Sequence, residues 1–471
     1  MNAAERKEIR LLLPAWIAAL AASIFPVWLV PRNWGNIEVG EIMFLFFFVA
    51  GALLLSLASF GLEMSFGTFA SLLAQPRRRQ KTWQLKIVLL ASALALVMLA
   101  GAFSLRLWRY SAATYIFSMW GWDEHEYCFL LLALMAFVGG LWTTLLFRQM
   151  LTAFWVAILA PLLLFCAFLV LRDWQGLRIS LMESFALVAC GYAVAGFLLA
   201  RWLFLRAQDK PEREATDAIA WSFLPAFRTR RGPVAALLVK ELRLQQGTLV
   251  FAAVLLLLQL AAMSASKFLP RNVLNRYAYF FWLGFLWLLA PVQVACASVA
   301  EERRGRTLES TLCLPVAGPA QFAIKMLVVL GLALFLGAVM PWLLEILRSV
   351  VESNDPPING SGLQPFLIIS VVLAGFGCYG SSVSSTFLHS FCAALFLGVV
   401  LLFGAELANW AISLLWPVLV LASFCLSYAN FKQVRITRLQ LLLNGLASVA
   451  IVFALQCLGW IFGIYVGDGG R

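Results

Sequence analysis

Residues 42–60 read IMFLFFFVAGALLLSLASF, an uninterrupted apolar run without a charged side chain. The run has the length of one helical crossing of a bilayer, which needs about 20 apolar residues. The 471-residue chain has this character throughout, because 63% of its residues are hydrophobic and 12% are charged. A soluble domain has about 45–50% apolar and about 25% charged residues. The composition therefore predicts an all-α polytopic membrane protein, and the continuous runs exclude a β-barrel, whose strands alternate in polarity.

Thirteen apolar segments are predicted as transmembrane helices. Two of them are separated only by residues 407–410, so a re-entrant loop there would give fewer spans. The first segment also fits a signal peptide, but its long apolar run favours a retained span. The predicted spans are 11–30, 42–60, 87–105, 127–147, 151–171, 185–205, 249–266, 278–299, 326–347, 366–388, 391–407, 411–431 and 441–465.

The chain carries 35 Lys and Arg against 23 Asp and Glu, a net charge of +12. In a soluble protein this excess would suggest nucleic acid as a partner. Here most basic clusters follow alternate spans, as at 77–81, 206–231 and 432–438, which is the distribution of cytoplasmic loops. Two basic loops, near 106–109 and 267–276, fall on the other side, but the larger number of basic residues decides the orientation. We therefore expect a multi-pass protein of the cell (inner) membrane, with a cytoplasmic N-terminus, the lipid bilayer as its surroundings and no nucleic-acid partner.

Two predicted cytoplasmic loops share a sequence pattern. Residues 63–76 read EMSFGTFASLLAQP, and residues 302–315 read ERRGRTLESTLCLP. A Lys follows each loop, at Lys86 and Lys325, and the matching positions are all 239 residues apart. A second pair of motifs, KEIRL at 7–11 and KELRL at 240–244, precedes the first and seventh spans. The pattern predicts an internal repeat.

The repeat divides the chain into four regions. Residues 1–205 and 234–431 form two six-span transmembrane units, residues 206–233 form a cytoplasmic linker, and residues 432–471 add one C-terminal span. Because six is even, the two units run parallel across the membrane, whereas inverted repeats need an odd number of spans.

Each repeated loop predicts a short helix at the membrane surface. Thr307 or Gly305 can cap the helix start, and Pro76 and Pro315 end it. Lys86 and Lys325 then lie where the next helix enters the lipid, which suits a snorkelling cation. The Lys-Glu-Leu-Arg segments are expected to be amphipathic interfacial helices whose charged side chains face water.

These motifs, in this order, resemble the permease subunit of ABC-2-type ABC transporters. The resemblance implies a permease without its own ATPase activity, with ATP and Mg bound by two copies of a cytoplasmic ABC ATPase subunit. The fusion of two units, the extra span, and Phe69-Ala70 in place of Leu308-Glu309 depart from the family pattern. The resemblance assigns Glu63, Gly67, Thr68, Phe69, Leu73, Pro76, Lys86, Glu301, Glu302, Gly305, Thr307, Glu309, Leu312, Pro315 and Lys325 to ATPase-coupling loops, and Lys7, Glu8, Arg10, Lys240, Glu241 and Arg243 to interfacial connecting helices.

The two loops are expected to contribute unequally to this docking. The second offers the carboxylates of Glu301, Glu302 and Glu309 to a basic partner, whereas the first offers Glu63 and the aromatic pair Phe66 and Phe69. We therefore expect Glu302→Lys to abolish coupled ATP hydrolysis, and Glu63→Lys to leave partial activity.

Other functional classes have weaker support. The sequence contains no Gly-x4-Gly-Lys-Ser/Thr motif, so it predicts no ATPase site and no enzyme. An ion-coupled secondary transporter is the alternative, but the span centres carry no charge, which favours an apolar or amphipathic substrate. His125 lies in an acidic loop that reads as solvated rather than metal-binding, and the nine cysteines have no metal-like spacing. Small residues around Ser381 and Ser382 are expected to allow close helix packing.

Overall fold

In the computed structural model every element of the described residues is helical. The described residues are 3–28, 37–74, 78–109, 124–174, 180–207, 232–265, 276–304, 307–313, 315–352, 363–395, 397, 412–433, and the single positions 437, 440, 443, 444 and 447. The chain divides into two compact units, Met1–Ala226 and Phe227–Arg471. This division falls within residues 206–233, predicted as a linker, most of which lie outside the described residues.

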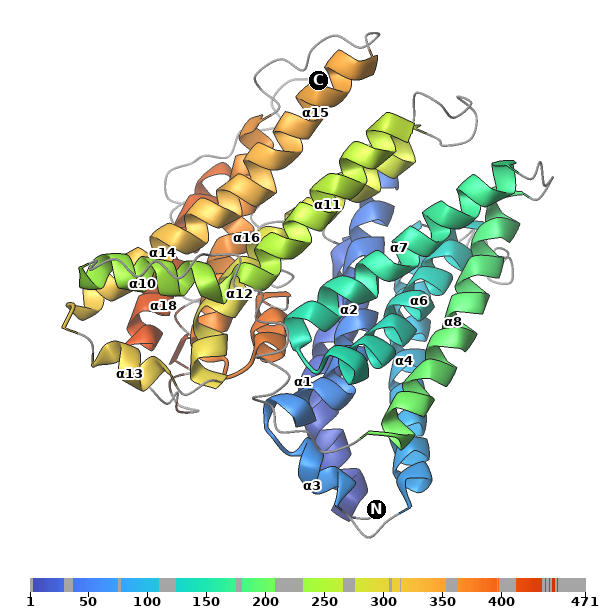
Figure 1. Ribbon diagram of the computed structural model, residues 1–471, viewed down its shortest axis with the longest axis horizontal. Helices are drawn as coiled ribbons and strands as arrows, with labels where there is room; N and C mark the ends of the chain where they lie inside the picture. Colours follow the sequence, from blue (N-terminus) through green and yellow to red (C-terminus); the bar gives the residue numbers. More distant parts are fainter. Residues whose placement is uncertain are drawn as a thin grey trace, which may run out of the picture. The chain divides into compact units, whose positions relative to one another are not determined.

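The first unit is a bundle of long helices (Figure 1). In it α2 packs against α1, α4, α6 and α7, and the short α3 lies between α2 and α4 in the chain. The elements are α1 (Ala3–Trp28), α2 (Ile37–Ser65), α3 (Phe69–Leu73), α4 (Arg79–Arg109), α6 (Glu124–Phe147), α7 (Met150–Trp174) and α8 (Leu181–Leu205).

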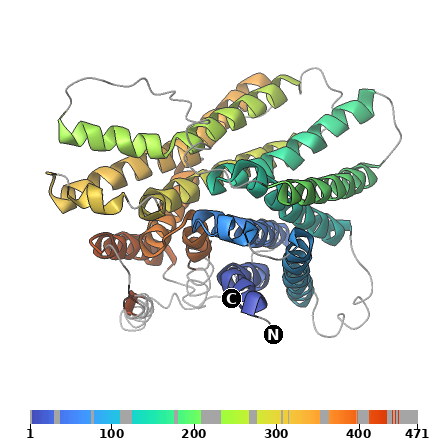
Figure 2. The same ribbon diagram turned by 60° about the horizontal axis from the view of Figure 1, so that its bottom comes forward.

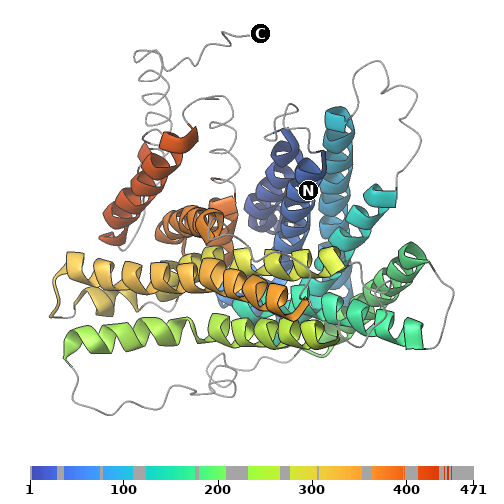
Figure 3. The same ribbon diagram turned by 90° about the horizontal axis from the view of Figure 1, so that it is seen from above.

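The second unit places α12 against α11, α14 and α16, with the short α13 between α12 and α14 in the chain. Figure 2 shows α10 lying along α14, and Figure 3 shows α14, η2 and α15 as one long helix. The elements are α10 (Pro233–Leu244), α11 (Gln246–Ala265), α12 (Arg276–Arg304), α13 (Leu308–Leu312), α14 (Gly318–Leu334), the π-helix η2 (Phe335–Val339), α15 (Met340–Glu352), α16 (Leu363–Val383) and α18 (Ile412–Phe431).

Long apolar helices make the chain a helical membrane protein. Among the described residues, seven helices are long and apolar enough to cross a membrane, and an eighth is gained if the bent pair α10–α11 is one span. Helices also occupy other predicted spans, as α7, α12 and α18 do. Most of each of the predicted spans 391–407 and 441–465 lies outside the described residues, so the predicted count of thirteen stays a prediction.

The two Lys-Glu motifs lie in different helical surroundings. In the second unit α10 is a separate helix that meets α11 at 54°, with Gln245 at the joint. In the first unit Lys7, Glu8 and Arg10 belong to α1, which continues unbroken to Trp28. The prediction of a separate connecting helix was therefore wrong for the first unit. The joint in the second unit is held by the Gln245 side chain, which donates a hydrogen bond to the Val294 carbonyl of α12 at 3.0 Å. In α1 the motif is followed by Leu12, Leu13 and Pro14 within the same helix.

A residue in the left-handed conformation, Gly67, ends α2 just before α3. Gly67 has a φ of +67°, which only glycine adopts without strain, and the Thr68 N–H donates to the Glu63 carbonyl at 2.9 Å. After α12 the Thr307 N–H donates to the Glu302 carbonyl at the same distance. Thr307 precedes α13 but its side chain does not cap that helix, contrary to the prediction, because its hydroxyl donates back to Glu302.

Small residues bring α12 and α16 close together, which confirms the expectation for Ser381. Its Oγ accepts hydrogen bonds from the Val299 and Ala300 N–H groups and donates to the Cys296 carbonyl, all at 2.9 Å. A Cβ placed on Gly377 would come within 2.6 Å of the Ala295 Cβ, so any larger residue there would separate the helices.

Replacing Ser381 by Ala should lower the free energy of unfolding by about 1–3 kcal/mol, because buried backbone groups of α12 lose their side-chain partner. Thermal unfolding of the purified protein in detergent measures the change. Ser385, which is exposed at the end of the same segment, supplies the control, since Ser385→Ala should stay within about 0.5 kcal/mol. Equal midpoints for the two variants would contradict the role given to Ser381.

Candidate functional site

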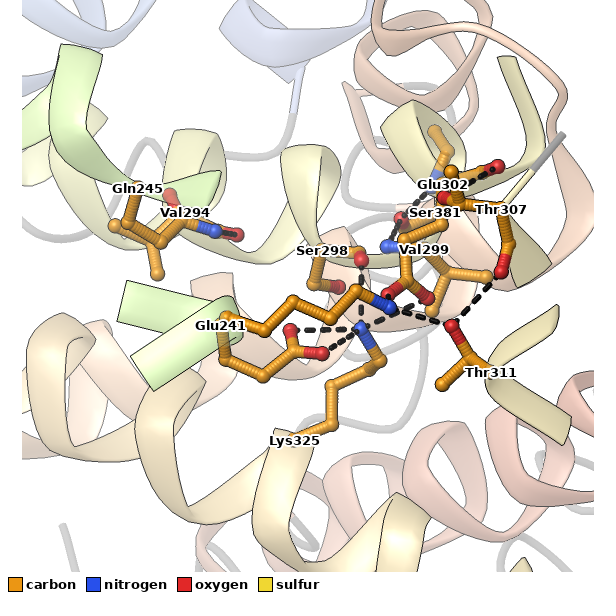
Figure 4. A network of polar contacts seen from close by, with 12 residues as sticks. Glu241, Gln245, Val294, Ser298, Val299, Glu302, Thr307, Thr311, Lys325 and Ser381 are labelled. Atoms are coloured by element: carbon orange, nitrogen blue, oxygen red, sulfur yellow. Dashed lines mark hydrogen bonds and ion pairs between the residues drawn. The ribbon is translucent and has the colours of Figure 1, made fainter. Parts of the chain in front are cut away.

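A buried lysine joins three helices of the second unit. The Lys325 Nζ of α14 lies 2.7 Å from a carboxylate oxygen of Glu241 on α10 and 3.1 Å from one of Glu302 on α12 (Figure 4). It also donates a hydrogen bond to the Ser298 carbonyl at 3.0 Å. The side chains of Lys325 and Glu302 are 2% and 1% exposed, so this ion pair is shielded from solvent.

A second lysine extends this group to the short helix α13. The Lys240 Nζ lies 2.5 Å from Glu302 Oε1 and also donates to the Thr311 hydroxyl, which in turn donates to the Thr307 carbonyl at 2.8 Å. Lys240, Glu241, Glu302 and Lys325, here called the second lysine cluster, carry two positive and two negative charges. The cluster is therefore neutral, and it holds α10, α12, α13 and α14 together at one point.

The first unit contains a matching group. The Lys86 Nζ of α4 lies 2.6 Å from Glu8 of α1 and 3.0 Å from Glu63 of α2, and it donates to the Ser59 carbonyl at 3.4 Å. Lys7 lies 3.5 Å from Glu63 and is 43% exposed. Lys7, Glu8, Glu63 and Lys86 form the first lysine cluster, with the same charges as the second.

The same positions carry the contacts in both units. Glu63, Lys86 and Ser59 each have their counterpart 239 residues later. An apolar layer next to each cluster follows the same arrangement. In the first unit Phe60, Trp83 and Phe204 pack with ring centroids 5.4–5.8 Å apart, and in the second Val299, Phe322 and Phe431 pack with Leu308. The recurring sequence pattern thus corresponds to a recurring three-dimensional contact.

Burial determines how much each cluster contributes to the free energy of folding. Removing an ion from water costs several kcal/mol, and paired charges recover this only while every partner is present. A complete cluster therefore adds little net stability. Loss of a buried member, such as Glu302 or Lys325, costs about 3–5 kcal/mol, and loss of the partly exposed Lys7 or Lys240 costs less. The clusters specify how the helices meet. Among the described residues no three His, Cys, Asp or Glu side chains could together hold a metal ion.

Several predicted orientations were wrong. Lys86 and Lys325 were expected to snorkel, but both are buried and ion-paired. Glu241 was expected to face water, but it is 4% exposed. Glu63 and Glu302 were expected to face a partner protein, but their side chains point into the units. The sequence shows a charge beside a span, and a charge paired inside the bundle gives the same pattern as one that faces water.

Other residues of the predicted site lie on or near the loop surface. Of the aromatic pair in the first loop, Phe69 is buried and Phe66 is 48% exposed. Glu301, near the end of α12, is half-buried and lies 3.5 Å from Arg304. The acidic residue that α13 exposes is Glu309. Thr307, Pro315, Arg10, Arg243 and Gly67 are exposed, Thr68 and Leu73 are half-buried, Leu312 ends α13, and Pro76 and Gly305 lie outside the described residues.

Sequence reasoning missed Thr311 and Gln245. Neither has a counterpart in the first unit, so the repeat gave no signal for them. Comparison with known proteins adds no relative, because no protein-family model, curated protein or solved structure matches the chain.

Proposed function

We propose that the chain is the membrane permease subunit of an ATP-driven exporter of the ABC-2 type, and that a separate subunit hydrolyses the ATP. The absence of a phosphate-binding motif from the sequence supports the second part of the proposal. The first part rests on the order of the motifs and on how α13 is held.

The attachment of α13 is the observation that carries the proposal. This helix exposes Thr307, Glu309 and Cys313, while Leu308 is buried against Val299 and the Thr311 hydroxyl accepts a hydrogen bond from Lys240. A protein that binds the exposed side of α13 would displace α10, α12 and α14 with it, because the second lysine cluster connects all four. Such an arrangement suits the transfer of motion from a docked ATPase to helices in the membrane.

The remaining features of the proposal follow the sequence. They are two parallel six-span units with an extra span, a cytoplasmic N-terminus in the inner membrane, and two copies of the ATPase subunit. An apolar or amphipathic substrate is proposed because the predicted span centres lack charges. The buried charges of the lysine clusters do not favour an ion-coupled carrier, since each cluster is neutral and tied to the end of α2 or α12.

A native cysteine allows a direct test. Cys313 follows α13 and is exposed, so a hydrophilic maleimide that carries a photoreactive group should attach to it in membranes of the native host. Illumination should then cross-link the chain to a soluble protein that contains a P-loop. Peptide sequencing of the cross-linked product identifies that protein.

The control is the Cys313→Ser variant, which keeps Cys190 and Cys425, the other exposed cysteines of the described residues, on α8 and α18. Its cross-linked product should be absent. Capture of a protein without a P-loop, or ATP hydrolysis by the rigorously purified chain alone, would overturn the proposed function.

A further inference from the structure

The two lysine clusters differ in one contact. In the second unit Lys240 bonds to both Glu302 and Thr311, so the cluster includes α13. In the first unit the position 239 residues before Thr311 is Leu72, a buried side chain that cannot accept a hydrogen bond. Among the described residues Lys7 contacts Glu63 and makes no hydrogen bond to α3. The buried Phe69 and Leu72 and the Thr68 bonds to the Glu63 carbonyl hold α3 in place.

The helices that carry the two motifs also differ. α10 is a short helix that meets α11 at 54°, and the Gln245 side chain anchors this joint to the backbone of α12 by one hydrogen bond. α1 is one helix from Ala3 to Trp28 with Pro14 inside it, so its Lys-Glu motif belongs to the same helix as the span. A hydrogen bond from Lys240 thus links α13 to α10, whereas α3 packs against α2, the helix that it follows in the chain.

We infer that the two units have unequal roles, with the second transmitting the motion of the ATPase into the membrane and the first serving as a fixed docking point. The inference rests on the proposed function and adds a division of labour to it. A displacement of α13 reaches α10 through the Lys240–Thr311 hydrogen bond, and the bend allows α10 to tilt against α11. In the described part of the chain α3 has no such hydrogen bond to α1. The Thr68 bonds to the Glu63 carbonyl attach α3 to α2, as the Thr307 bonds to Glu302 attach α13 to α12.

Paired variants separate this role from a general effect on stability. Lys240→Met and Lys7→Met remove the same charge from equivalent positions, and Thr311→Val removes only a hydroxyl at nearly constant volume. The complex of chain and ATPase, captured as above, is placed in nanodiscs. The measured quantity is the ratio of coupled to basal ATP hydrolysis, that is, the rate of the ATPase bound to the chain divided by the rate of the ATPase alone. Lys240→Met and Thr311→Val should lower that ratio about tenfold with the ATPase still bound, because a charge-assisted hydrogen bond is lost. Lys7→Met should stay within about twofold, because the bond it disturbs lies outside the transmitting path.

Hydrogen exchange tests the contact without any partner. In the isolated chain Thr311→Val should speed amide exchange in α13 and α10 together, Thr311→Ser should restore the native rates, and Lys7→Met should leave exchange in α3 unchanged. An unchanged α13 in Thr311→Val would overturn the inference.

The outcomes also distinguish failure of the proposed function from failure of the division of labour. If the native complex contains no ATPase, the proposed function fails and the division of labour fails with it. If the ATPase is present and Lys7→Met and Lys240→Met reduce coupling equally, the division of labour is wrong while the proposed function stands.

Discussion

Replacing Lys325 by Met should lower the free energy of unfolding of the second unit by about 3–5 kcal/mol. The substitution keeps the length and apolar stem of the side chain, so packing changes little. It leaves Glu241 and Glu302 facing one another in a buried position with only the partly exposed Lys240 to balance them. The loss comes from uncompensated buried charge.

Heating in detergent with a thiol-reactive fluorophore follows this change, because Cys296 and Cys378 are buried in the same unit and react when it opens. The matched control is Lys81→Met, an exposed lysine whose loss should cost less than about 0.5 kcal/mol. Adding Glu241→Gln and Glu302→Gln to Lys325→Met should recover most of the lost stability. If the triple variant is no more stable than Lys325→Met alone, the charge balance of the cluster is not the cause.

The class of protein and the positions of most helices could be predicted from the sequence. Runs such as 42–60 have no soluble alternative, and the helix α2 that contains this run extends from Ile37 to Ser65. The two repeated loops were also predictable, because Glu, Thr, Pro and Lys keep one register. What the pattern left open was which side of each helix faces inward.

The buried charges show why this part could not be predicted. Each motif taken alone looks like a charged flank that ends a span. The motifs taken together carry more information. In the first unit Lys86 occurs with Glu8 of the Lys-Glu motif, and in the second unit Lys325 occurs with Glu241 of the matching motif. Opposite charges that recur together near the ends of apolar spans indicate pairing inside a bundle, because an unpaired charge there is costly. Gln245 and Thr311 gave no such signal, since each occurs in one unit only.

Glu302→Lys should prevent the second unit from folding, which is a different reason for lost activity from the one expected from sequence. The substitution brings a third ammonium group next to Lys240 and Lys325 and leaves Glu241 as the one carboxylate of the cluster. Repulsion between buried like charges adds to the lost ion pairs, so the effect should exceed that of Lys325→Met. The amount of full-length protein that elutes as a single species from a size-exclusion column in detergent measures it.

Glu63→Lys should be as damaging, because Glu63 is equally buried between Lys86 and Lys7. Glu309→Lys supplies the contrast, since its exposed side chain can reverse its charge without disturbing the fold, and its effect should appear only in the binding of the ATPase. If Glu302→Lys instead accumulates as folded protein that binds the ATPase poorly, its side chain faces the partner. The second lysine cluster would then not exist in the membrane, and the division of labour inferred from it would fail with it.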